Sequence, residues 1–373
     1  MPVPKPVVLI GFLNRGQTGP IPTITAAFMQ GLGDRYRFVA HVANRKYGAT
    51  LQAALNPING YYFLKHLLSW IALLIVRSPD IAHYPVTSFW NLEKSLVFLR
   101  VARFFRARTV GHLHGGAFMD FWRDLTPLRK KHALRQLRRL DAFVVLSDGW
   151  KRRIETEVGL DSGKVFVVSN PIDQEFEEEV VRIPVPRMTE TILSLGVMDQ
   201  DKGVLDIVDA VEGLLPRTGW HLALVGPERQ PGIRARVQER VEQRGLSAHV
   251  RLFPGVRGSE KITLFRDASL FLLPSYFENF PLVIIEAAAA GLPIITTPIG
   301  AVPEFFEDGK SILFVEPGNV PQIRDVLAAL INDSDRRNAL GSAAREVFIK
   351  RLSRKDIMRS LDDTYHYALS GKV

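Results

Sequence analysis

Two glutamates and a lysine in the second half of the chain have the residue types and the local context of a ligand site. Glu278 lies in the segment Ser275–Phe280, between an apolar run that ends at Pro274 and a helical pattern that opens at Pro281. A strand, a loop and a helix in this order direct free backbone amides and the positive end of the helix dipole at whatever lies above the sheet. The segment therefore predicts an anion site, typically for phosphate.

Glu286 falls within the apolar, alanine-rich helical segment Leu282–Ala290. A carboxylate on such a helix is costly to bury unless it accepts hydrogen bonds. The ribose hydroxyls of a nucleotide would supply those bonds, and so would a neighbouring backbone or side-chain donor. Both interpretations stay open from this segment alone.

Lys202 stands just before a second predicted helix, Val204–Leu215, in a loop that follows an apolar run. A cation is electrostatically disfavoured at a helix N-terminus, so a bound anion explains this lysine better than helix stability does. Asp199 and Asp201 have the spacing of a metal-binding pair. Acids ahead of a helix are common as caps, however, and two carboxylates would weaken a phosphate site, so we expect no metal here.

Two further candidate ligand loops lie in the first half. The segment Gly11–Gly19 has the spacing of a P-loop except that Gln17 occupies the lysine position, which argues against an NTPase and leaves a glycine-rich turn that a ligand can approach closely. His112 and His114 follow a predicted strand at its carboxyl end, where α/β sheets place ligands. Two histidines are too few for a zinc site, so we expect hydrogen bonding by His114.

Alternating apolar runs and helical patterns predict an α/β protein with parallel sheets that position these loops. The predicted strands form two similar series: Val7–Ile10, Phe38–Val42, Ile81–His83, Thr109–His112, Phe143–Leu146 and Val165–Val168, then Thr191–Leu195, His221–Val225, Val250–Phe253, Leu270–Leu273, Ile294–Thr296 and Ile312–Phe314. Between the series, the acidic and proline-containing segment Glu175–Met188 is expected to be an irregular linker. We expect domains over residues 1–182 and 183–350, and a helical tail over 351–373 that crosses back to the first domain.

Composition excludes several classes of protein. The chain has 373 residues, enough for two cores, and its 46% hydrophobic and 23% charged residues are ordinary for a globular protein. It has no cysteine, which excludes disulfides, cysteine-ligated metals and thiol catalysis. The N-terminal segment lacks the pattern of a signal peptide, so we expect a cytoplasmic protein.

The net charge of +9 favours anionic partners. Basic residues cluster in the first half beside aromatic ones, which is typical either of a solvated helix face or of a patch that binds an anionic membrane surface. The apolar stretch Tyr61–Val76 is shorter than the roughly 20 residues that span a bilayer, and we expect a buried or partly surface-lying helix. Neither a zinc-finger nor an RNP motif is present, so we expect no nucleic-acid partner.

Taken together, these residues resemble the retaining glycosyltransferases of family 4, which have the GT-B fold. The segment Glu278–Ala287 looks like the E-x7-E signature of that family, and Ala290–Ile295 with Gly300 and Glu304 continues it. Other matches occur in the same order along the chain: the early glycine loop, His114-Gly115, Ser169–Asp173, Lys202-Gly203 and Val225-Gly226.

The resemblance implies two Rossmann-like, doubly wound domains that face each other across a cleft, with an N-terminal acceptor domain and a C-terminal donor domain. It implies a metal-independent, hexosyltransferase-type enzyme that moves a sugar from a nucleoside diphosphate to a glycan or lipid-linked acceptor, with no cofactor. Glu278 would hold the donor sugar, Glu286 the ribose, Lys202 the pyrophosphate, and His114 would lie beside the transferred sugar. The remaining donor-binding positions would be Gly16, Asn279, Phe280, Pro281, Leu282, Val283 and Gly226.

The chain departs from the family pattern at two positions. Many relatives carry an arginine where this chain has Val197, so the pyrophosphate must rely on Lys202, on the amides of Leu282 and Val283, or on a basic residue elsewhere. Asn279 replaces the usual glycine, and asparagine tolerates left-handed backbone better than most residues. A nucleotide-sugar epimerase and a noncatalytic nucleotide-sugar-binding protein of the same architecture are the alternatives.

Overall fold

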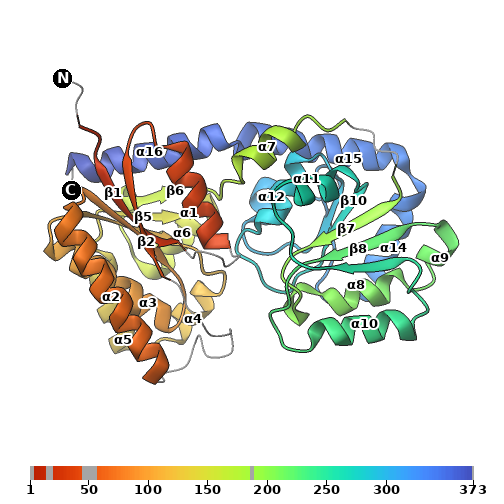
Figure 1. The fold of residues 1–373 in the computed structure, drawn as a ribbon, viewed down its shortest axis with the longest axis horizontal. Helices are drawn as coiled ribbons and strands as arrows, with labels where there is room; N and C mark the ends of the chain where they lie inside the picture. The colour runs from red at the N-terminus through yellow and green to blue at the C-terminus, as the bar shows by residue number, and fades with distance from the viewer. Residues whose placement is uncertain (1–3, 14–19, 44–56, 185–188, 372–373) are drawn as a thin grey trace. The chain divides into compact units, whose positions relative to one another are not determined.

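The computed structural model describes residues 4–13, 20–43, 57–184 and 189–371 (Figure 1). The chain forms two compact units, one from Met1–Pro171 together with Arg354–Val373 and the other from Ile172–Ser353. Each unit has a parallel six-stranded sheet with helices packed on it. This architecture confirms the predicted α/β fold class, and every predicted strand is present, with ends that move by three residues at most.

The first sheet has the order β2-β1-β3-β4-β5-β6. Its strands are β1 (Val7–Leu13), β2 (Arg37–Val42), β3 (Ile81–Val86), β4 (Arg108–Leu113), β5 (Ala142–Val145) and β6 (Val165–Val167). The helices of this unit are α1 (Pro20–Gly31), α2 (Pro57–Arg77), α3 (Trp90–Phe104), α4 (Phe118–Asp124), α5 (Pro127–Leu137), α6 (Asp148–Arg153) and α16 (Arg354–Ser370). Because parallel crossovers are right-handed, α2, α3 and α5 cover one face of this sheet while α1 and α16 pack together on the other (Figure 1).

The second sheet has the order β12-β11-β10-β7-β8-β9. Its strands are β7 (Thr191–Leu195), β8 (His221–Val225), β9 (Val250–Phe253), β10 (Leu270–Leu273), β11 (Ile294–Thr296) and β12 (Leu313–Phe314). The helices are α7 (Gln174–Val180), α8 (Val204–Val211), α9 (Leu215–Thr218), α10 (Ile233–Gln243), α11 (Gly258–Arg266), α12 (Leu282–Ala289), α13 (Val302–Phe305), α14 (Val320–Asn332) and α15 (Ser334–Val347). The strand order reverses between β7 and β10, and such switch points are where open α/β sheets bind ligands.

The segment expected to be an irregular linker is partly helical. Residues Gln174–Val180 form α7, whose N-cap Asp173 accepts a hydrogen bond from the Phe176 amide at 3.0 Å. Phe176 is buried, and its ring packs edge-on against that of Phe265 on α11. The capping aspartate and this apolar contact outweigh the acidic run that argued against regular structure, and they attach α7 to the second unit.

The C-terminal helix α16 is attached to the first unit through a buried carboxylate. Asp362 is 4% exposed, forms an ion pair with Arg35 and accepts a hydrogen bond from the Tyr36 hydroxyl at 2.8 Å. Burial of Tyr36 and its bond to this carboxylate raise the pKa of the phenol, so the hydroxyl stays protonated and donates. Asp362 therefore joins the last helix to the start of the chain.

We expect Asp362→Ala to destabilise the first unit by about 2–3 kcal/mol, because the buried Tyr36 hydroxyl loses its acceptor. The measurement is urea-induced unfolding followed by circular dichroism. The neighbouring exposed residue gives the control, since Asp363→Ala should change stability by less than about 0.5 kcal/mol. Equal stability of the two variants would contradict the anchoring role.

Candidate active site

Lys202 and Glu278 meet at the switch point of the second sheet. Lys202 ends the short 3₁₀ turn Gln200–Lys202 after β7, and Glu278 lies in the loop after β10. The two strands are neighbours in the sheet, so their carboxyl ends lie at the same edge. The side chains form an ion pair, and they are 18% and 17% exposed. The structure thus brings together the two residues that the sequence singled out separately.

The two loops are held together by a glycine and by a backbone bond. Gly203 has a φ of +69°, and a Cβ there would lie 2.6 Å from the carbonyl oxygen of Pro274. The amide of Tyr276 donates to the Asp201 carbonyl at 2.8 Å. A side chain at position 203 would push the loops apart, so this glycine sets the approach of Lys202 to Glu278.

Several buried polar atoms in the segment Ser275–Glu286, which contains Glu278, lack a hydrogen-bond partner within the described residues. They are both side-chain atoms of Asn279, the hydroxyl of Ser275 and Oε2 of Glu286, on residues that are 8%, 0% and 2% exposed. An unsatisfied buried polar atom costs about 1–3 kcal/mol. Four such atoms in one twelve-residue segment indicate a site whose hydrogen bonds are completed by a polar ligand.

Glu286 has a partner that the sequence did not reveal. Its Oε1 pairs with the ammonium of Lys261 on α11, and that ammonium also lies 5.0 Å from the centre of the Phe176 ring. For Oε1, the structure therefore shows the second interpretation of Glu286, in which the carboxylate pairs with a neighbouring side-chain donor. Because Oε2 has no partner in the described part of the chain, the same carboxylate still offers an acceptor to a ribose hydroxyl.

The loop residues Asn279–Pro281 lead into α12 and contact the loop that follows β11. Pro281 is the N-cap residue, one position before the helix that the sequence predicted it to open, and the amides of Leu282 and Val283 belong to the first turn. The Asn279 carbonyl accepts a bond from the Ala301 amide at 2.7 Å. A Cβ on Gly300 would lie 1.9 Å from that carbonyl oxygen, so only glycine fits there.

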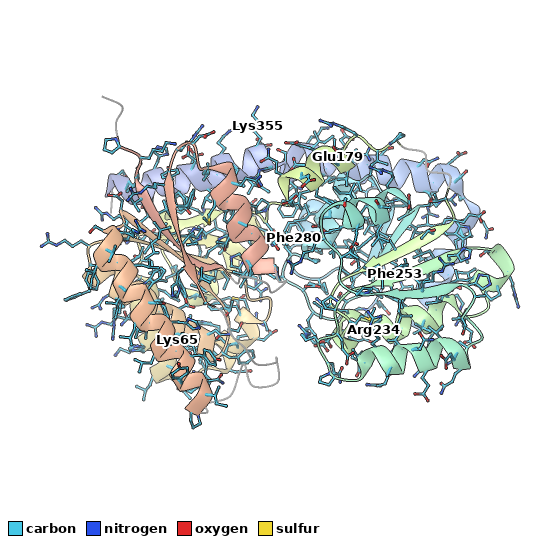
Figure 2. All side chains as sticks on the ribbon, in the orientation of Figure 1. Lys65, Glu179, Arg234, Phe253, Phe280 and Lys355 are labelled. Carbon is cyan, nitrogen blue, oxygen red and sulfur yellow. The ribbon has the colours of Figure 1, made fainter. Side chains whose placement is uncertain are left out.

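Phe280 is buried and stacks on Phe305, with ring centroids 4.8 Å apart (Figure 2). This predicted donor-binding residue therefore has a packing role, since its ring fixes the loop that carries Glu278 and Asn279.

The loops after β7 and β8 touch at their backbones. A Cβ on Gly226 would lie 1.6 Å from the Gly196 carbonyl oxygen, which explains the glycine at the predicted position. The Arg234 guanidinium donates to the Gly226 carbonyl at 3.0 Å and to the Phe253 carbonyl at 2.6 Å, and Figure 2 labels both side chains on this unit. These contacts fix the backbone next to the Lys202 loop.

Arg229 is a second cation that sequence reasoning missed. It follows β8, its amide donates to the Met198 carbonyl at 3.2 Å, and its guanidinium pairs with Asp199 and lies 3.8 Å from Asp201. Asp199 also caps the 3₁₀ turn by accepting from the Asp201 amide, which confirms the capping interpretation of this aspartate. A basic residue thus reaches the loop of Val197 from the neighbouring strand.

His114 belongs to a histidine cluster in the first unit. His83 on β3 bonds to the Tyr365 hydroxyl of α16 at 2.7 Å and to the His112 ring at 3.2 Å, and the rings of His112 and His114 are centred 4.1 Å apart. His114 thus stands at the end of a chain of side chains that starts on α16. Gly16, the other predicted residue of this unit, lies outside the described residues.

Comparison with known proteins finds a glycosyltransferase family model for each of the two units. Residues 28–176 match the family model described as glycosyltransferase family 4, and residues 175–347 match the model described as glycosyl transferases group 1. A D-inositol 3-phosphate glycosyltransferase of Corynebacterium jeikeium is 32% identical over 177 residues, which are 46% of this chain and 42% of that relative. The aligned part of the chain spans less than half the length of this relative and of two others from Corynebacterium.

Solved structures share the fold along the whole chain at low identity. A glycosyltransferase from Rickettsia africae has a TM-score of 0.78 and 18% identity, and the match covers 99% of this chain and 100% of the other. Anabaena HepE, solved in complex with UDP and glucose, has a TM-score of 0.72 and 16% identity, with 97% and 99% covered.

The histidine cluster predicts acid sensitivity. Burial lowers the pKa of His83 to about 3 and that of His112 well below its usual value. In the unfolded chain the histidine pKa values are about 6.5, so between about pH 6.5 and 3 the unfolded chain binds protons that the folded chain does not bind. The free energy of unfolding is therefore highest above about pH 6.5 and decreases as the pH falls toward 3. Each of these two imidazoles should remove about 1.4 kcal/mol per pH unit in that window.

Urea unfolding at about pH 7.5 and about pH 5.5 measures this loss, since most carboxylates stay ionised over that interval. His112→Phe should reduce the pH dependence, because it removes one of the buried imidazoles, whereas His132→Gln, which changes an exposed histidine of α5, should leave it unaltered. A wild-type stability that is the same at both pH values would contradict the neutral, buried state of the cluster.

Proposed function

Because the chain belongs to family 4 of the glycosyltransferases, with the group 1 region in its second unit, we propose that it transfers a hexose from a nucleoside-diphosphate sugar to an acceptor hydroxyl with retention of anomeric configuration. The acceptor is a glycan or a lipid-linked glycan. The UDP and glucose bound to Anabaena HepE make UDP-hexoses the first donors to test.

One observation carries this proposal: the segment that contributes Glu278 to the Lys202–Glu278 pair also contains buried polar atoms with no hydrogen-bond partner among the described residues. A nucleoside-diphosphate sugar offers groups that fit each of them. Its diphosphate fits the lysine and the α12 amides, its ribose fits the free oxygen of Glu286, and its sugar hydroxyls fit Glu278 and Asn279.

During transfer the bond between the anomeric carbon and the diphosphate oxygen breaks, and its electron pair leaves with the diphosphate. The acceptor oxygen bonds to the anomeric carbon on the same face, which places its proton next to the departing oxygen that takes it up. The protein mainly stabilises negative charge on the diphosphate, and Lys202 with the first-turn amides of α12 performs this task. Glu278 holds the sugar and forms no covalent bond.

Lys202→Ala and Glu278→Ala are each expected to lower kcat at least about 100-fold while the protein stays folded, because each removes a group that contacts the reacting part of the donor. Turnover is measured by mass spectrometry of the product, and folding by thermal denaturation. Lys310→Ala is the matched control, since it breaks an exposed lysine–glutamate pair of the same unit and should keep normal activity. Near-normal turnover in either site variant contradicts the assignment.

Arg229→Ala is expected to weaken UDP binding about tenfold, because it removes the positive charge that the loop after β8 places beside the Lys202 loop. Calorimetric titration with UDP gives the dissociation constant. The exposed Arg236 on α10 supplies the control, and its alanine variant should bind UDP as the wild type does. An unchanged constant for Arg229→Ala would show that this arginine serves only Asp199.

The donor and the reaction class are tested together by a thermal-shift panel of UDP-, GDP- and ADP-sugars, followed by product analysis with candidate acceptors. Transfer to an acceptor with retained configuration is the expected result. Isomerised donor without transfer would identify an epimerase, and binding without hydrolysis or transfer would identify a noncatalytic binding protein. Either of these outcomes overturns the proposal.

A further inference from the structure

Helix α2 exposes an apolar face along its whole length. Its outward-facing large side chains recur every three or four residues over its first half and reappear near its end, and they are between 47% and 73% exposed: Ile58, Tyr61, Leu64, Leu68, Ile75 and Val76. In the described chain, α2 alone is long and apolar enough to cross a membrane by length and composition. The apolar stretch Tyr61–Val76 lies within this helix, which extends over 21 residues, and of the two expected placements, buried or partly surface-lying, the structure shows the second.

The opposite face of α2 is fixed to the first sheet. Trp70 is fully buried, and its indole donates to the Phe98 carbonyl on α3 at 3.1 Å. Its ring also packs edge-on against those of His41 and Tyr84, and Leu74 is 1% exposed. A helix held in this way lies along the surface of the unit. Its exposed face is an amphipathic surface rather than one side of a membrane-spanning segment.

The charges around this face are basic. The segment Pro57–Arg77 contains no acidic residue, and Lys65 lies on the exposed side of the helix (Figure 2). The adjacent α3 carries Arg100 and Arg103 and one acid, Glu93, which pairs with Arg129 of α5. Helix α5 beside it carries four basic residues and no acid. Between α3 and α5 a cavity of about 280 Å³ is lined by Arg100, Arg103 and Arg139 together with polar and apolar side chains.

We propose that the first unit docks on an anionic lipid bilayer through the outward face of α2. The helix lies in the plane of the interface with its leucine and isoleucine side chains among the acyl chains. The arginines of the α3–α5 cavity contact lipid phosphates. Apolar side chains and basic residues on one surface are the combination that binds anionic membranes.

A second copy of the chain fits this surface less well. Two copies that met through α2 would bring the basic residues of α2, α3 and α5 of each molecule close together, and like charges oppose such contact. An anionic bilayer satisfies the apolar residues and the positive charge at once. The inference concerns the first unit alone and does not depend on sugar transfer, so the two proposals can fail separately.

Vesicle co-sedimentation of the full chain tests the docking surface. Vesicles of phosphatidylcholine with phosphatidylglycerol should bind the protein at about 0.05 M salt and bind it less at about 0.5 M salt, where screening is stronger. Vesicles of phosphatidylcholine alone should bind it weakly. Leu68→Glu should weaken binding at least about tenfold, because a carboxylate is placed among acyl chains. Arg100→Ala should weaken it about fivefold, as the loss of one basic residue near the surface implies.

Ile349→Glu is the matched control, because it introduces the same carboxylate at an apolar residue of similar exposure in the second unit. Its vesicle binding should equal that of the wild type. A wild-type protein that stays in the supernatant with every lipid composition would overturn the proposal, as would equal binding by Leu68→Glu. Light scattering that shows a wild-type dimer converted to a monomer by Leu68→Glu would instead assign the face to a second copy.

Discussion

The ion pair between Lys202 and Glu278 is the interaction on which the candidate site depends. Each charge needs a partner because both side chains are largely buried, and an unpaired charge at this depth would be costly. The ion pair therefore holds the ammonium of Lys202 next to the carboxylate of Glu278 at the edge of the sheet. A ligand that brings its own negative charge and its own hydroxyls can take both partners over, so a nucleoside-diphosphate sugar finds a site whose charges are already in place.

The fold explains why this pair forms. The strand order of the second sheet reverses between β7 and β10, so two loops distant in sequence begin at adjacent strand ends. Gly203 permits the close approach of these loops, and Gly300 does the same for the turn that carries Asn279. The first unit repeats the architecture, with its own reversal between β1 and β3. The polar side chains at its sheet differ from those of the second unit, because it has neutral histidines hydrogen-bonded to Tyr365 where the second unit has the ion pair.

Much of this architecture was predictable from the sequence. The strands are short apolar runs between turn residues, a strong local signal, and the order of the glycine, lysine and glutamate motifs indicated the family. The partners supplied by other elements were not predictable. Lys261 reaches Glu286 from α11, and Arg229 reaches Asp199 from the loop after β8, contacts that depend on how the helices and loops pack. The sequence left a buried and a partly surface-lying helix open for α2, since its composition does not show which face the sheet covers.

The most direct measurement is a crystal structure of the protein with UDP bound. The account predicts the diphosphate at the first turn of α12, with Lys202 Nζ within about 3 Å of a phosphate oxygen and the ribose hydroxyls bonded to Glu286. A diphosphate bound elsewhere, with the Lys202–Glu278 pair intact and Glu286 bonded only to Lys261, would contradict it.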